Sequence, residues 1–115
     1  MSATAPERWT AHATHADVAV LVIPPDARRD RRFEIACRYV VARKTEAPAR
    51  HGLRIDVNGS LEWQRSLPTE NPGATDSLDY RFRREIPAGQ ALRIVAKSEA
   101  QGAQRLRLEI EADEA

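Results

Sequence analysis

The 115-residue chain has a single cysteine, few aromatic residues and almost no net charge. Because Cys37 is alone, no intramolecular disulfide can form, and a disulfide-stapled scaffold is excluded. A formal net charge of +1 gives no general electrostatic attraction to nucleic acid or to anionic membranes. The longest apolar run, Val18 to Ile23, is far shorter than the roughly 20 residues of a membrane helix.

The N-terminal residues Met1 to Arg8 lack the basic start and the long apolar stretch of a secretory signal. We therefore expect a cytoplasmic, soluble protein. No nucleotide-binding, hydrolase or metal-site motif is present, so we also expect no cofactor and no metal.

What the chain does have is a period of two in its hydrophobic pattern. From Leu106 to Glu111, apolar and charged residues alternate strictly. Since successive side chains of a strand point to opposite faces, this period predicts half-buried strands. Segments of this kind, separated by turn residues, are expected at residues 9–14, 17–23, 33–43, 53–57, 61–67, 78–86, 91–97 and 104–111.

Seven or eight short strands without a long helix predict an all-β fold. The expected architecture is an antiparallel two-sheet β-sandwich, either immunoglobulin-like or jelly-roll-like. We expect one domain over residues 8–112, a flexible tail at residues 1–7 and a frayed end at residues 113–115. Residues 17–23 are apolar on both faces, which predicts a central or doubly covered strand, with Trp9 or another subunit as its cover.

The length of each turn decides which residues of the two flanking strands lie opposite each other. Asn58-Gly59 usually signals a two-residue type I′ turn, which would place Asp56 opposite Leu61. That pairing mixes core and solvent faces, so we predict a three-residue bulged loop instead. A three-residue turn at residues 87–89 would likewise keep apolar residues of the flanking strands on one face, so a hairpin is predicted there too. The predicted pairs are Ile55 with Leu61, Leu53 with Trp63, and Ile94 with Leu108 across Gly102.

Antiparallel strands place successive loops at alternate ends of a sandwich. Loops 24–32, 58–60 and 87–90 then share an Arg-rich end, and loops 44–52, 67–77 and 98–103 share the other. Binding sites usually lie in such loops, and the second end has the longer ones. Its binding candidates are His51, Glu70, Asn71 and Asp76. The alternative is that these are surface loops without a specific role, in which His51 is solvated.

Two arginine features are further candidates. Arg84 falls among the apolar residues of its strand. Because a buried unpaired guanidinium is costly, we expect a bulge that turns it outward or a carboxylate partner at the rim, with anion binding as the alternative. The densest cationic cluster could bind an anion or an acidic partner, but it lacks the interleaved aromatic residues that stack bases. It consists of Arg28, Arg29, Arg31 and Arg32, and a solvated loop with local ion pairs is the alternative.

No other residues in the sequence form a recognisable catalytic or metal-binding pattern. His12 and His15 have no further ligands to complete a metal site, and Cys37 lies in an alternating strand where a buried thiol is inert. We predict a non-catalytic binding or protein-interaction module of unknown ligand, with self-association as one variant. The alternatives are a carbohydrate- or small-ligand-binding jelly roll that uses Trp9 or Trp63, and an enzyme with a loop-built site of His51, Glu70 and Asp76.

Overall fold

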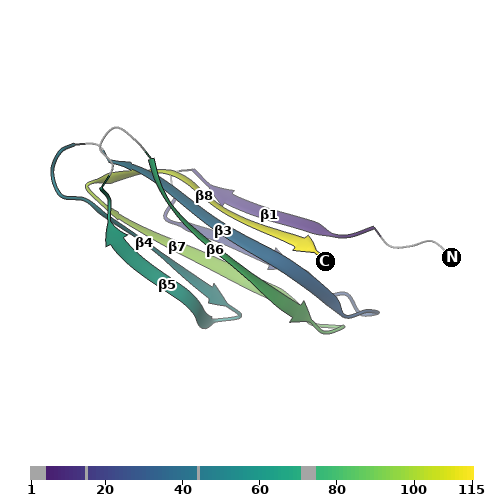
Figure 1. Cartoon of the computed structure of the whole chain (residues 1–115). Coiled ribbons are helices and arrows are strands. Elements are labelled where there is room, and N and C mark those ends of the chain that lie inside the picture. The colour runs from purple at the N-terminus through teal and green to yellow at the C-terminus, as the bar shows by residue number, and fades with distance from the viewer. Residues whose placement is uncertain (1–4, 15, 44, 71–74) are drawn as a thin grey trace.

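The computed structural model describes residues 5–14, 16–43, 45–70 and 75–115. These residues form eight strands and no helix (Figure 1). The predicted all-β, antiparallel two-sheet sandwich is therefore confirmed. The strands are β1 (Arg8–Ala13), β2 (Val18–Ile23), β3 (Arg31–Arg43), β4 (Arg50–Val57), β5 (Ser60–Pro68), β6 (Thr75–Ile86), β7 (Leu92–Gln101) and β8 (Ala103–Glu114).

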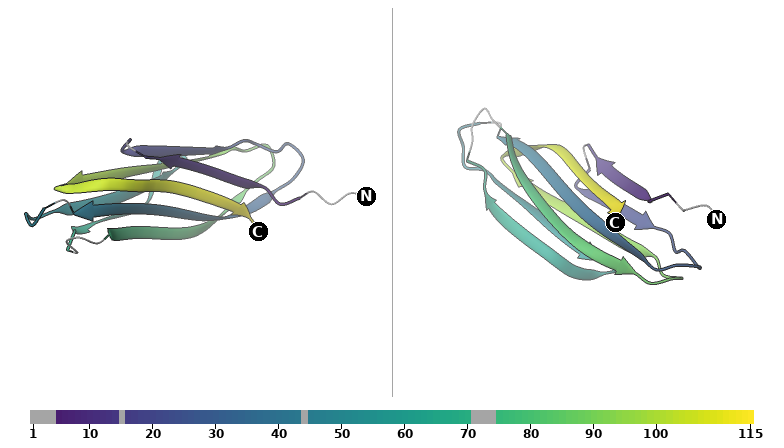
Figure 2. Two further views of the ribbon diagram at one scale, coloured as in Figure 1. Left: turned by 90° about the horizontal axis from the view of Figure 1, so that it is seen from above. Right: turned by 45° about the vertical axis from the view of Figure 1, so that its right-hand side comes forward.

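The strands form two four-stranded antiparallel sheets, which lie along the same long axis (Figure 2). One sheet has the order β1-β8-β3-β6 and the other the order β2-β7-β4-β5. Only β4 and β5 are consecutive strands that pair, and every other connection crosses from one sheet to the other. This is the eight-stranded arrangement of a jelly roll. An immunoglobulin domain instead groups strands A, B, E and D against C, F and G.

Two predicted hairpins are wrong because of these crossings. The turn at residues 87–89 leads from β6 into the opposite sheet, and Ile94 and Leu108 lie on β7 and β8, which do not pair. Parity along the chain shows which side chains face the core. It does not show which of two sheets the next strand joins, since both sheets supply the same core.

The inward row of β3 is the centre of the core. Its side chains are at most 1 % exposed, and β3 pairs with β6 on one side and β8 on the other. Each such apolar side chain stabilises the fold by about 1.5–3 kcal/mol on burial. The row consists of Phe33, Ile35, Cys37, Tyr39 and Val41.

The β4–β5 turn corrects a third prediction. Asn58 and Gly59 have φ angles of 50° and 82°, so the turn is a two-residue loop of type I′. The predicted three-residue loop is wrong, and Asp56 does pair with Leu61. The register shifts one step inside the ladder, so that Ile55 pairs with Trp63. A bulge within the strand, and not in the turn, thus keeps Ile55 in the core.

Strand β2 lies at the edge of its sheet, so the prediction of a central or doubly covered strand is also wrong. Its inward residues are buried, but Val18, Val20 and Val22 are 36 %, 41 % and 50 % exposed on the outer face. The sequence pattern shows that both faces of the strand are apolar. It cannot show whether the chain itself covers the second face.

Two glycines provide a matched test of the turns. Gly59 and Gly102 both have positive φ, at 82° and 68°. A Cβ at Gly59 would meet nothing within 4 Å, whereas a Cβ at Gly102 would lie 3.0 Å from the carbonyl oxygen of Pro48. We expect Gly59→Ala to cost about 1–2 kcal/mol, the strain of a left-handed alanine. Gly102→Ala should cost more, as measured by urea unfolding. Equal losses would contradict the close approach of Pro48.

Candidate functional site

The structure places three of the four loop candidates close together at one end of the sandwich. His51 Nδ1 lies 2.6 Å from the hydroxyl oxygen of Thr69, the residue before Glu70. The backbone N–H of Glu70 donates a hydrogen bond to the Asp76 carboxylate at 3.1 Å. The fourth candidate, Asn71, lies outside the described residues.

His51 belongs to β4, and its side chain is only 2 % exposed, so the expectation of a solvated loop histidine is wrong. Strand β4 begins at Arg50, three residues earlier than predicted, and this places His51 on the inward row with Leu53. Burial lowers the pKa of His51, and the Asp76 carboxylate offsets part of that effect. The ring is therefore held neutral in the interior.

This cluster is poorly suited to catalysis. Thr69, the only hydroxyl bonded to His51 among the described residues, is itself 3 % exposed. A nucleophile and base that solvent cannot reach are also closed to a substrate. The ring of Tyr39 approaches His51 edge-on, with the centroids 6.3 Å apart. The arrangement is that of a packed interior, in which His51 Nε2 has no hydrogen-bond partner.

Arg84 lies on β6, in the part of the strand remote from the His51 cluster, and it pairs with Glu62 on β5. The β3–β6 ladder runs without a register shift, so no bulge turns Arg84 outward. The sequence left two structural explanations for Arg84, a bulge or a carboxylate partner at the rim. The structure shows the carboxylate partner, Glu62. Tyr80 also donates a hydrogen bond to Glu62, at 3.2 Å.

Next to this ion pair, aromatic side chains form a column between the edge strands β5 and β6. Trp63 stacks on Tyr80 with ring centroids 4.8 Å apart, and Tyr80 stacks on Phe82 at 5.5 Å. The Arg84 guanidinium lies 5.8 Å from the centroid of the Phe82 ring. Because the rings cover one another, Tyr80 offers no free face to a sugar. The column joins the two sheets along their open side.

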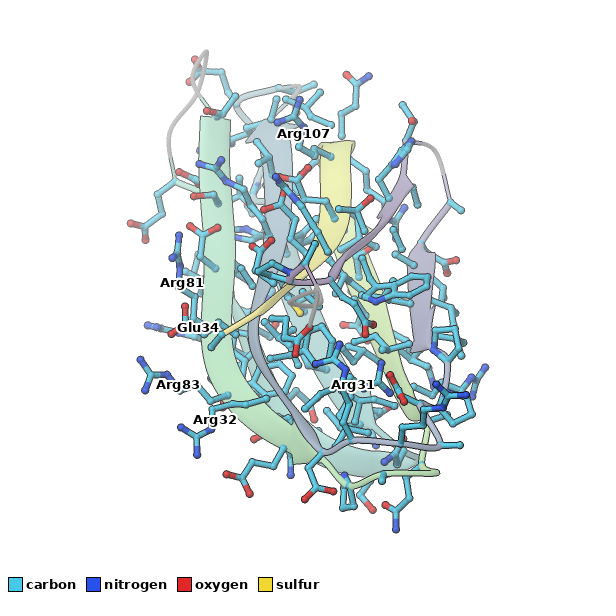
Figure 3. The ribbon with its side chains drawn as sticks, turned by 90° about the vertical axis from the view of Figure 1, so that its right-hand side faces the viewer. Arg31, Arg32, Glu34, Arg81, Arg83 and Arg107 are labelled. Carbon is cyan, nitrogen blue, oxygen red and sulfur yellow. The ribbon has the colours of Figure 1, made fainter. Side chains whose placement is uncertain are left out.

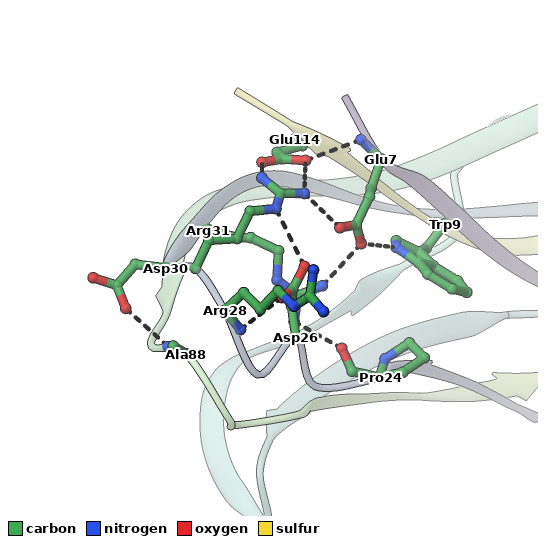
Figure 4. A network of polar contacts seen from close by, with 10 residues as sticks. Glu7, Trp9, Pro24, Asp26, Arg28, Asp30, Arg31, Ala88 and Glu114 are labelled. Carbon is green, nitrogen blue, oxygen red and sulfur yellow. Dashed lines mark hydrogen bonds and ion pairs between the residues drawn. The ribbon is translucent and has the colours of Figure 1, made fainter. Parts of the chain in front are cut away.

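The arginine cluster is largely neutralised by carboxylates (Figure 4). Arg29 pairs with Glu7 at 2.7 Å, with Asp26 at 3.2 Å and with Glu114. The hydrogen bond from Arg29 lowers the pKa of Glu114. Arg31 is buried in β3 and pairs with Glu7 at 2.8 Å. The network therefore ties residues near both chain termini to the β2–β3 loop.

The other two members of the cluster are exposed. Arg32 pairs with Glu85 at 2.7 Å, and the backbone N–H of Arg28 donates to Asp26. Trp9, one of the two aromatic candidates for sugar binding, donates from its indole nitrogen to Glu7 at 2.9 Å. Polar groups singled out in the sequence are thus largely engaged within the fold.

The outer face of the β1-β8-β3-β6 sheet carries charged side chains in register (Figure 3). Arg83 pairs with Glu34 at 2.9 Å, and both are exposed. The small side chain of Ala36 leaves an open hollow of about 370 Å³ beside Arg81 and Glu111. Exposed ion pairs of this kind contribute little to stability and are typical of a solvated sheet face.

The second apolar face that the sequence predicts for residues 17–23 lies on the outer side of the other sheet. We name Val18, Val20 and Val22 the valine stripe. Val20 pairs with Val95 of β7, which is only 9 % exposed, so the exposed apolar surface is confined to β2. Arg93 and Lys97 of β7 pair with the two ends of the stripe. The two apolar faces of residues 17–23 predict a second face that needs a cover, and in the structure that face is exposed.

Cys37 does not offer a reactive thiol. It is buried, and burial raises its pKa to about 12, so almost no thiolate forms near neutral pH. Within the described residues, no three His, Cys, Asp or Glu side chains gather as a metal site. His15, part of the H-x-x-H pair, lies outside those residues. No helix in the described part of the chain is long and apolar enough to cross a membrane.

Comparison with known proteins shows the fold alone. No protein-family model matches the chain, and no curated protein matches its sequence. Part of dimeric latent PorU from Porphyromonas gingivalis is similar in structure, with a TM-score of 0.52 and 11% identity over 93% of this chain and 13% of that one. Part of the Cry4Aa toxin of Bacillus thuringiensis is also similar, with a TM-score of 0.53 and 12% identity over 89% of this chain and 18% of the toxin chain.

A family 35 carbohydrate binding module from Clostridium thermocellum is similar at a TM-score of 0.43 and 14% identity. It covers 93% of this chain and 98% of that one. The chain spans less than a fifth of the length of the PorU and Cry4Aa chains that it matches. At 11–12% identity, the likeness to the PorU and Cry4Aa chains shows the fold alone and implies no ligand or activity.

The buried His51 predicts a pH dependence of stability. Its folded pKa lies below the ordinary value of 6.5, so protons bind the unfolded chain more readily. The contribution of His51 to the free energy of unfolding should be constant above pH 6.5 and should fall as the pH drops below that value. His51→Gln should flatten this fall between about pH 5 and 6.5, while the exposed His12→Gln should not. Identical slopes in all three proteins would show that His51 titrates normally.

The Arg29 network predicts a second pH dependence. Because the pKa of Glu114 is lowered, its pairing stabilises the fold above the ordinary value of 4.5 and is lost as the pH falls through the lower folded value. Arg29→Gln should lower the thermal midpoint at pH 7 more than Arg32→Gln, which breaks one exposed pair. The difference between the two variants should shrink in acid. Equal midpoints at pH 7 would contradict a role for Arg29 in holding Glu7 and Glu114 against the β2–β3 loop.

Proposed function

We propose that this chain is a non-catalytic protein-interaction domain, and that its partner docks on the valine stripe of β2. The observation that carries the proposal is the exposure of Val18, Val20 and Val22, at 36–50 %, on an uncharged edge strand. Single exposed apolar residues are ordinary, but three exposed valines in a row on one face of a strand are typical of interaction surfaces.

The engagement of the polar groups supports the non-catalytic part of the proposal. Arg29 and Arg31 are bonded to carboxylates, His51 is packed in the interior, and Arg84 is paired with Glu62. Carbohydrate binding has less support, since Trp63 is stacked on Tyr80 and Trp9 is bonded to Glu7. A net charge of +1 favours a protein partner over nucleic acid.

The proposal can be tested by photo-crosslinking in the cells that produce the protein. p-Benzoyl-phenylalanine replaces Val20 on the stripe or, as a control, the exposed Arg81 on the outer face of the other sheet. On irradiation, position 20 should give a discrete crosslinked species and position 81 should not. No adduct at position 20, or the same adducts at both positions, would overturn the docking surface.

A further inference from the structure

Beside the valine stripe, strand β2 also has a free backbone edge. Strand β2 pairs with β7 alone, so the backbone groups along its other edge have no strand partner among the described residues. Proteins usually protect such edges with charged residues or proline, because an unprotected edge pairs with other chains. Along its six residues, Val18–Ile23, β2 carries neither.

The other three edge strands are protected in this way. Strand β1 carries Arg8 and His12, and β5 ends at Pro68. Strand β6 projects a row of charges from its outer face: Asp79, Arg81, Arg83 and Glu85. Among the edges that the structure describes, β2 is thus the exception, and its edge is suited to pairing with another uncharged strand.

We propose that β2 pairs antiparallel with β2 of a second copy of this chain, around a two-fold axis through Val20. The proposal rests on the proposed function as an interaction domain and identifies its partner. The two four-stranded sheets would become one continuous eight-stranded sheet. A two-fold edge contact is self-complementary, since each copy presents the same edge strand to the other and the two valine stripes lie side by side on one face of the joined sheet.

Strand parity selects the register. A two-fold axis perpendicular to the sheet keeps core residues on the core face only if it passes through a residue. An axis through Val20 places Val18 opposite Val22 of the copy. An axis through Leu21 would place Val18 opposite Pro24, which has no N–H to donate to the ladder. The axis through Val20 therefore preserves both the faces and the hydrogen bonds.

The charges beside the stripe also favour edge pairing of copies. Arg93 and Lys97 lie on β7, one strand inward from the edge. In the paired sheet, Lys97 of one copy and Arg93 of the other would be three strand spacings apart, about 14 Å. That exceeds the Debye length of about 8 Å at physiological salt, so their repulsion is screened. Stacking two copies face to face would instead bring the cationic borders together.

The association is tested by sedimentation velocity on the purified full chain over micromolar to millimolar concentrations. The wild-type chain should shift from monomer to dimer. Val20→Glu should remain monomeric, because it would place two carboxylates against each other at the axis. Thr10→Glu, on the neighbouring exposed edge strand β1, is the matched control and should dimerise as the wild type does. Circular dichroism confirms that each variant is folded.

Disulfide trapping tests the register. The V20C variant, oxidised with copper phenanthroline, should form a disulfide-linked dimer, since the two introduced thiols face each other across the axis. V18C alone should not, but a mixture of V18C with V22C should give the mixed dimer. The native Cys37 is buried, with its pKa raised to about 12, and should not interfere. Equal crosslinking of V18C and V20C alone would overturn the Val20 axis.

The two proposals can fail separately. A wild-type chain that stays monomeric at every concentration overturns pairing between copies. If position 20 then photo-crosslinks to a different protein in cells, the interaction domain stands and its partner is another chain. A photo-crosslinked product of twice the mass of the chain supports both. The absence of self-association and of any adduct overturns both.

Discussion

The structure depends on one long strand that is buried on its inner face and paired on both sides. Strand β3 places Phe33, Ile35, Tyr39 and Val41 in the core, while β6 and β8 hydrogen-bond to its two edges. Because those side chains fill the space between the sheets, the opposite sheet must present its own apolar row to them. The crossings between sheets build this shared core, since consecutive strands, apart from β4 and β5, supply its two sides alternately.

The sandwich is closed along its flanks by polar and aromatic contacts. On one side, Arg29 of the β2–β3 loop binds Glu7, just before β1, and Glu114, the last residue of β8. On the other, the column of Trp63 and Tyr80 bridges the edge strands β5 and β6. Residues whose chemistry first suggested binding are therefore used to complete the fold. What remains without a structural use is the valine stripe of β2.

The period-two pattern predicts the all-β class, the approximate strands and the faces of most side chains, because alternation is a local property of a strand. It does not predict which sheet a strand joins, as the absence of an Ile94–Leu108 pair shows. The same limit applies to β2, whose outer face is bare for a reason of topology. His51 was misplaced because Arg50 and Gly52 look like loop residues, although β4 already includes them. The grouping of loops at one end of the sandwich correctly predicts that His51 lies near Asp76, but it does not show that His51 is buried.

The central claim is that the edge of β2 is a pairing surface, and hydrogen exchange reports on that edge directly. In an edge strand, alternate backbone N–H groups point away from the sheet and exchange readily unless another strand covers them. Exchange of the Val18–Ile23 amides, followed at low and high protein concentration, should show outward-pointing amides that become protected as the concentration rises. Amides of β5, the other edge of the same sheet, should not change. Concentration-independent exchange throughout β2 would contradict the account.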